Sequence, residues 1–118
     1  MRYVSEKADR KVSENRIVML IRGGRVTKDM LAEELALRLV NGYGWSEPDY
    51  ASKAPVYEKK DVTITLYSSA VQVYRHSTGD NLMVPYEAIS YVSIEEAGSS
   101  LMFIVKDKSG LSMDMMIQ

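Results

Sequence analysis

The chain has 118 residues and a mass of 13.3 kDa, enough for one domain and too short for a second sizeable core. Its hydrophobic fraction of 46% and charged fraction of 26% are globular values and exclude a disordered chain. It contains no cysteine, which excludes disulfides, thiolate nucleophiles and cysteine-ligated metals and suits a reducing compartment. No apolar run approaches the ~20 residues that span a bilayer, and no secretory signal precedes the first strand. We therefore expect a single domain over residues 1–118, cytoplasmic and without membrane contact.

Charge is distributed unevenly along the chain. The formal net charge is −1, yet residues 1–28 hold eight basic and three acidic side chains, so this segment is +5 and the remainder −6. Such asymmetry indicates an anion-binding end, or two oppositely charged faces that meet in a self-assembly. Scattered, solvated charge is the third interpretation.

The N-terminal third predicts an arm, a strand and a turn. Residues 1–15 are polar and are interpreted as a mobile arm, with a short helix capped by Ser5 as the alternative. Arg16–Arg22 (RIVMLIR) is an almost fully apolar run bounded by Gly23-Gly24, which is typical of a buried strand.

An amphipathic helix follows the turn. Thr27 is a suitable N-cap, and a leucine recurs every four residues through Leu31, Leu35 and Leu39. Leu37 and Val40 are expected to broaden this apolar stripe, and Glu34 and Arg38 stand in the favourable order for an ion pair along the helix. The helix is predicted to end at Asn41-Gly42, residue types that tolerate the left-handed conformation.

The remainder of the chain predicts an antiparallel sheet. Residues 42–60 are interpreted as a long aromatic loop, after which the apolar pattern changes to a period of two. The expected strands are 62–67, 70–75, 82–84 (interrupted at Pro85 and resuming over 91–95), 101–106 and 111–117. The predicted fold is α+β: an antiparallel β meander of four to five strands, with one N-terminal strand and one amphipathic helix packed on it.

Two partial family resemblances cover residues 62–110. Strand and turn residues in this stretch resemble the middle of bacterial pleckstrin-homology-like or GRAM-type β domains: Ile64, Leu66, Val84-Pro85-Tyr86, Ile89, Val92, Ile94 and Leu101–Val105. That resemblance implies a β domain, although the family usually ends in a capping helix and this chain ends in a strand. The second choice is the Sm-like β fold, which is similar at Tyr86, Ala88, Ile89 and Val92. Neither resemblance assigns a functional residue.

Residues able to run chemistry are scarce in this sequence. The only histidine is His76, expected to be solvated in a turn, and no second imidazole or cysteine is available for a zinc site. Glu95 and Glu96 are neighbours on a predicted strand and should point to opposite faces rather than form a carboxylate pair. We expect no enzyme, no cofactor and no metal.

The first of three candidate binding regions is the basic turn at the start of the helix. Its residues are Arg22, Gly23, Gly24, Arg25 and Lys28. Cations are unfavourable at a helix N-terminus, so a bound phosphate is one explanation for their presence there. The alternative is a turn that needs glycine, with the arginines splayed into water.

The other two regions are interaction surfaces. Tyr43, Trp45 and Tyr50 lie in the 42–60 loop and would form a contact or stacking platform if exposed, or pack over the sheet if buried. Met113, Met115 and Met116 lie in the last strand, a candidate sheet edge that would pair with a second copy or a partner. The alternative is that the edge of this strand is covered.

The sequence therefore predicts a small, non-catalytic binding module. The first hypothesis is a protein-interaction or inhibitory, regulatory protein of the kind that phages also carry, which self-associates as a homodimer or larger assembly and binds a protein partner. The alternative is a phosphate-recognising module that binds a nucleotide or nucleic acid through the basic Gly-Gly turn.

Overall fold

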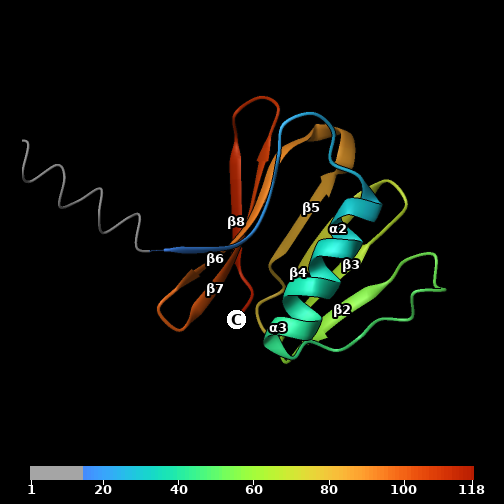
Figure 1. Cartoon of the computed structure of the whole chain (residues 1–118), viewed down its shortest axis with the longest axis vertical. Helices are drawn as coiled ribbons and strands as arrows, with labels where there is room; N and C mark the ends of the chain where they lie inside the picture. The colour runs from blue at the N-terminus through green and yellow to red at the C-terminus, as the bar shows by residue number, and fades with distance from the viewer. Residues whose placement is uncertain (1–14) are drawn as a thin grey trace, which may run out of the picture.

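The computed structural model describes residues 15–118, so the predicted arm lies, apart from Asn15, outside the described residues. Two four-stranded antiparallel sheets and one helix make up the fold (Figure 1). The predicted α+β class with antiparallel strands and a single helix is confirmed. The first sheet has the order β1-β6-β7-β8 and the second the order β2-β3-β4-β5. Their bounds are β1 Arg16–Arg22, β2 Val56–Lys59, β3 Val62–Leu66, β4 Ala70–Arg75, β5 Asn81–Pro85, β6 Ile89–Ala97, β7 Ser100–Asp107 and β8 Ser112–Met116.

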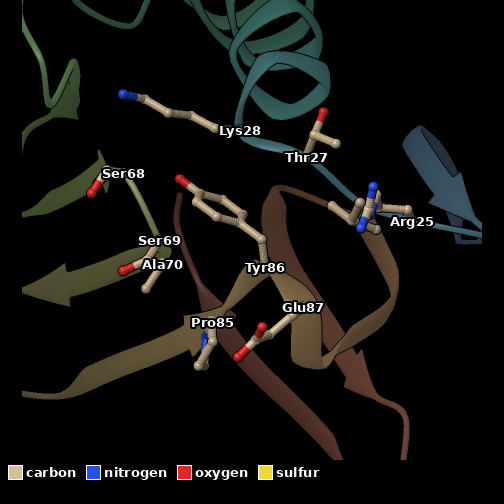
Figure 2. A pocket seen from close by; sticks show the side chains of 10 residues that line it. Arg25, Thr27, Lys28, Ser68, Ser69, Ala70, Pro85, Tyr86 and Glu87 are labelled. Carbon is tan, nitrogen blue, oxygen red and sulfur yellow. The ribbon is translucent and has the colours of Figure 1, made fainter.

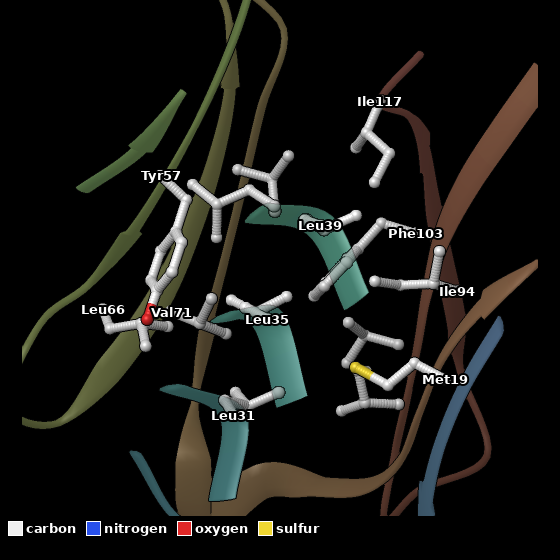
Figure 3. Close-up of a cluster of buried hydrophobic side chains, with 14 of the residues drawn as sticks. Met19, Leu31, Leu35, Leu39, Tyr57, Leu66, Val71, Ile94, Phe103 and Ile117 are labelled. Atoms are coloured by element: carbon white, nitrogen blue, oxygen red, sulfur yellow. The ribbon is translucent and has the colours of Figure 1, made fainter. Parts of the chain in front are cut away.

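The helix lies between the two sheets and supplies the centre of the core. Leu31, Leu35 and Leu39 are fully buried, as the four-residue spacing predicts. Figure 3 shows these leucines between Tyr57, Leu66 and Val71 of the second sheet and Met19, Ile94 and Phe103 of the first. A single apolar stripe therefore packs against both sheets.

The helix begins as predicted but ends later. The Thr27 hydroxyl accepts a hydrogen bond from the Met30 amide at 3.2 Å, which caps α2 (Lys28–Leu35). The helix continues through a π-helical turn, η1 (Ala36–Val40), into α3 (Asn41–Tyr43). The predicted end at Asn41-Gly42 is wrong, because Gly44 is the residue in the left-handed conformation, with φ 72°.

The tertiary structure explains this later end. The Trp45 amide donates to the Leu39 carbonyl at 3.1 Å while the indole is buried in the core. The Tyr43 hydroxyl donates to Glu96 of β6 at 2.7 Å. The Trp45 bond caps the extended helix, and the Tyr43 bond holds its last turn against the first sheet, a long-range contact that local propensity at Asn41-Gly42 does not describe. Leu37 is also displaced from its predicted place in the stripe, because the helix presents it to solvent.

Two features of the strands differ from the prediction. The 42–60 segment is not a loop throughout, since β2 pairs with β3 and buries Tyr57. The predicted strand interrupted at Pro85 is two strands in different sheets, joined by the short 3-10 helix η2 (Tyr86–Ala88). Proline ends β5 on a sheet edge, where a missing N–H is tolerated, and the chain then crosses to β6. Seven strands follow the helix, against the four or five expected.

Among residues 15–118, no helix is both long and apolar enough to cross a membrane.

Candidate functional site

The basic turn borders an open cavity of about 570 Å³ between the helix start and the β3–β4 and β5–β6 connections (Figure 2). Tyr86 lies in its wall, nearly buried, and its hydroxyl donates to the Tyr67 carbonyl at 2.7 Å. Burial raises the pKa of the Tyr86 phenol to about 12. The Lys28 ammonium donates to the Lys53 carbonyl at 2.5 Å. In Figure 2 the side chains of Lys28 and Arg25 lie on opposite sides of Tyr86.

The five residues predicted to bind an anion are therefore divided between two places. Arg25 and Lys28 border the Tyr86 cavity, which Glu87 also lines. Arg22 lines a different hollow, beside Met30 of the helix. Gly23 and Gly24 are exposed and have positive φ angles of 77° and 61°, so the glycines serve the turn itself. Phosphate recognition stays a prediction. Of the three basic residues that it requires, Arg25 and Lys28 line one cavity and Arg22 lines another.

The aromatic loop does not form an exposed platform. Trp45 is 3% exposed, and its indole N–H donates to the Gln118 side chain at 3.1 Å, whereas Tyr50 is 51% exposed. Tyr43 is half-buried and bonded to Glu96. Of the three aromatics considered as an interaction surface, Trp45 therefore follows the buried alternative, because its ring is more stable in the core than in water, and a surface role for Tyr43 and Tyr50 stays a prediction.

The terminal strand β8 is a sheet edge, as predicted, but its outer side faces β5. Met115 is buried and Met116 exposed, which is the predicted alternation, and Met113 is intermediate. Residues of β5 and β8 line a shared crevice of about 500 Å³. The Arg75 guanidinium donates to the Met116 carbonyl and joins the second sheet to the end of β8. This edge is therefore partly covered within the same chain.

The lone histidine is part of a hydrogen-bonded turn. His76 Nε2 lies 2.6 Å from the Thr63 hydroxyl at the protein surface. The nearby Asp61 carboxylate accepts hydrogen bonds from the amide and the hydroxyl of Ser77, and its carbonyl accepts from the His76 amide at 2.8 Å. Asp61 is thus engaged in holding the β4–β5 turn against the β2–β3 turn. These contacts account for the four residues as a structural cluster.

Among the described residues, hydrogen bonds lower the pKa of three carboxylates, and this makes the stability of the fold sensitive to acid. The pKa of Asp61 is lowered chiefly by the Ser77 hydroxyl, that of Glu96 by the Tyr43 hydroxyl, and that of Asp107 by the Ser109 hydroxyl. A depressed folded-state pKa stabilises the protein above the unfolded pKa and ceases to do so as pH falls through the folded value. The free energy of unfolding should therefore fall as pH drops below the ordinary values of 4.5 for Glu and 3.8 for Asp.

Urea denaturation at pH 7 and pH 3 measures this loss. Asp61→Asn should remove part of the difference between the two pH values, whereas Asp114→Asn, at an exposed position of β8, should leave it unchanged. An equal free energy of unfolding at both pH values would contradict the lowered pKa values of these carboxylates.

Exposed apolar side chains lie on β1 and on the outer side of the helix. They are Ile17 and Leu20 of β1, 53% and 40% exposed, and Met30 and Leu37 of the helix, 38% and 50% exposed. Met30 and Leu37 are seven residues apart, two turns along one side of the helix. We use the name β1–helix face for these four residues together with the charged residues beside them. Those charged residues line two hollows between β1 and the helix.

Two hollows between β1 and the helix continue this surface along the strand. One, of about 380 Å³, is lined by Arg16, Arg38 and Glu96 together with Val18 and Leu37. The other, of about 330 Å³, is lined by Arg22, Glu33 and Glu34 together with Leu20 and Met30. The charged residues of the first hollow therefore sum to a net charge of +1, and those of the second hollow sum to −1.

The outer edge of β1 also has no strand partner among the residues that the structure describes. Of the four sheet edges, β2 is capped by Ser46, whose amide donates to the Glu58 carbonyl at 2.9 Å, and β5 and β8 face each other. Within residues 15–118, β1 forms backbone hydrogen bonds to β6 and to no segment on its other side. An edge strand of this kind presents unpaired N–H and C=O groups to a further strand.

Sequence reasoning missed the β1–helix face. The run RIVMLIR was read as buried on both sides, and Leu37 as part of the core stripe. The available signal was that Met30 and Leu37 lie off the four-residue spacing of Leu31, Leu35 and Leu39, and so had to point elsewhere.

No protein-family model, no curated protein and no solved structure matches this chain. The resemblances of residues 62–110 to pleckstrin-homology-like and Sm-like domains stay predictions.

Proposed function

We propose that this protein is a non-catalytic binding module whose binding surface for another protein is the β1–helix face. The observation that carries the proposal is that, within residues 15–118, the outer edge of β1 has no strand partner and exposed large apolar side chains lie on β1 and the neighbouring helix. Single exposed apolar residues are ordinary on a protein surface. Here Leu20 and Met30 line one hollow and Val18 and Leu37 another, both beside the same strand edge, and such grouping is typical of protein contacts. Binding by strand addition uses the backbone for affinity and the adjacent side chains for specificity.

The surroundings of the reactive side chains support a non-catalytic role. His76 and Asp61 are used in joining two turns, and Glu96 is paired with Arg16 at 3.1 Å and with Tyr43. Glu95 instead accepts a hydrogen bond from Ser93. The absence of cysteine agrees with a cytoplasmic protein, which is part of the same proposal.

Phosphate recognition is the second candidate and has less support. It requires Arg22, Arg25 and Lys28 to converge on one anion, and they line two separate hollows. Lys28 already has a carbonyl acceptor on Lys53.

A comparative capture experiment tests the protein-binding proposal. Tagged wild-type protein and the variant Leu37→Glu are used to capture proteins from the source cells, and the captured proteins are quantified by mass spectrometry. Leu37 is half exposed, so the substitution leaves the core intact while placing a charge in the middle of the face. We expect at least one protein, a second copy of this chain included, to be captured at least tenfold less by the variant.

Met83→Glu is the matched control, because Met83 is an equally exposed apolar residue on β5. Its captured proteins should equal those of the wild type. If Leu37→Glu and Met83→Glu capture the same proteins in the same amounts, the β1–helix face is not the binding surface and the proposal fails.

A further inference from the structure

We infer that the outer face of the first sheet binds a second copy of the same chain, so that two first sheets pack face to face. The inner face of this sheet carries Met19, Ile94 and Phe103, which point toward the leucines of the helix (Figure 3). The outer face is the opposite side of the same four strands. It shares only side chains of β1 with the β1–helix face, so the inference goes beyond the proposed function.

The amino-acid pattern of two strands is the first reason. Ile17–Ile21 of β1 (IVMLI) and Leu101–Val105 of β7 (LMFIV) are each five consecutive apolar residues. A strand with one face in water alternates apolar and polar residues, whereas an unbroken apolar run is typical of a strand that is covered on both faces. Among residues 15–118, the helix and the second sheet lie over the inner face and no helix or strand lies over the outer one. The pattern therefore favours a further layer on the outer face.

The strand register places the outward apolar side chains beside one another. Met102 and Ile104 are two residues apart on β7 and so share the outer face, and Met116 of β8 pairs with Met102. Leu20 of β1 is separated from Ile104 only by Ser93 of β6, a small residue with no exposed surface. Leu20 and Met116 are 40% and 46% exposed, and Met102 and Ile104 are partly exposed. Apolar side chains grouped in this way mark a protein contact.

Opposite charges lie at the two ends of this apolar group. Arg22 pairs with Tyr91, and Tyr91 with Lys106, so the two cations lie in one row across the strands. The Lys106 ammonium lies 4.6 Å from the centroid of the Tyr91 ring, on the same side of the sheet. Glu95 points outward four residues along β6 from Tyr91, in the row that contains Met102. The apolar group therefore lies between a positive row and a negative one.

This distribution of charge is complementary to itself. A twofold axis that crosses the strands at the row of Leu20 and Ile104 places these two residues over their own equivalents. The same axis places Glu95 of each copy over the positive row of the other copy. Asp114, which pairs with Ile104, is exposed on the edge strand β8, so its carboxylate remains in water at the rim. Such a contact is isologous, because both copies contribute the same residues.

The size of the face sets the strength of the expected dimer. Four strands about 4.8 Å apart, with about seven residues of roughly 3.4 Å each, give a face of about 19 Å by 24 Å. Specific protein interfaces bury about 800 Å² on each partner, so this face lies at the low end. We therefore expect a reversible dimer with a dissociation constant in the micromolar range.

Sedimentation velocity on the full chain, from low micromolar to submillimolar concentration, tests the inference. With rising concentration, the wild type should shift from the 13.3 kDa chain toward twice that mass. Ile104→Lys should weaken dimerisation at least tenfold, because it places a charge in the centre of the contact. Ile104→Thr keeps a β-branched side chain that suits a strand and should weaken dimerisation severalfold. Circular dichroism checks the fold of both variants, and Ile104→Thr keeps the test decisive if Ile104→Lys unfolds.

Two control variants separate this face from the other exposed surfaces. Met83→Glu places a charge on the outer face of the second sheet, where Met83 is 51% exposed. Leu37→Glu places a charge on the helix side of the β1–helix face. Both variants should dimerise like the wild type.

Three results would overturn the inference: a monomer at every concentration, a dimer that a folded Ile104→Thr variant leaves at full strength, or a dimer that Leu37→Glu breaks. None of these decides the proposed function, which depends on whether Leu37→Glu loses captured proteins other than this chain. Loss of such capture beside a wild type that stays monomeric would leave the proposed function standing and the dimer excluded. Unchanged capture beside a dimer that the Ile104 variants weaken would have the opposite meaning.

Discussion

Replacing Leu35 with alanine should lower the free energy of unfolding by about 3–5 kcal/mol. Leu35 is fully buried in the middle of the helix and lies between the two sheets, where side chains from both pack around it (Figure 3). Truncation there removes contacts to both sheets at once and leaves a cavity that neither sheet can fill without moving the helix. Because small domains have only about 5–15 kcal/mol of stability, the change should be visible as a large drop in the urea midpoint.

Leu37→Ala is the matched control, two residues further along the same helix and half exposed. It changes the same side chain to the same residue and should alter stability by less than about 0.5 kcal/mol. Both variants are measured at a concentration at which light scattering shows a monomer. Equal losses from the two substitutions would mean that the helix is rotated relative to the sheets.

Replacing Trp45 with alanine should have a second large effect, a loss of about 3–5 kcal/mol of stability. The indole is buried at the point where the chain leaves the helix. Its N–H donates a hydrogen bond to the side chain of Gln118, 73 residues later in the sequence. Trp45→Phe keeps most of the apolar contact and removes the N–H donor. That variant should lose about 1 kcal/mol for the hydrogen bond, plus a packing term for the smaller ring.

Tyr50→Ala distinguishes the core role of Trp45 from a general role of the aromatic loop. Tyr50 is exposed in the same loop, and its removal should change the thermal midpoint by no more than one or two degrees. A Trp45→Ala variant as stable as Tyr50→Ala would show that the indole is at the surface in solution, as the sequence-based hypothesis of an aromatic platform required.

Local patterns predicted most of the elements in this fold. The leucine spacing identified the buried side of the helix, Thr27 identified its N-cap, and the alternation at Val62, Ile64 and Leu66 identified the strand β3. These features depend on neighbours within a few residues, which a sequence displays directly. The predicted end of the helix was wrong because Tyr43 donates a hydrogen bond to Glu96, and these two residues are more than fifty positions apart in the sequence.

The division of the strands into two sheets was not predictable in the same way. Pro85 was correctly read as a break, but nothing local indicates that β5 and β6 belong to different sheets. The strand β2 was missed because only Tyr57 of its four residues is buried, too short an alternation to separate from a loop.

The candidate surfaces show the same limit. The basic turn, the aromatic loop and the terminal strand were selected by composition, and the fold divides the first, buries Trp45 of the second and partly covers the third. The β1–helix face unites a strand and a helix that each look unremarkable alone. Its residues are identified only when pairing with β6 has used one edge of β1 and packing of the leucines has set the rotation of the helix.

The pairing of β1 with β6 also has a consequence for how the chain folds during synthesis. Arg16 pairs with Glu96 and Arg22 with Tyr91, so about seventy residues or more separate the two partners. Translation proceeds at about 5–20 residues per second, so β1 remains without its partner for several seconds after it is made. The apolar run from Ile17 to Ile21 is accessible to chaperones and to other nascent chains during that interval, and its flanking arginines are then the charges that disfavour aggregation.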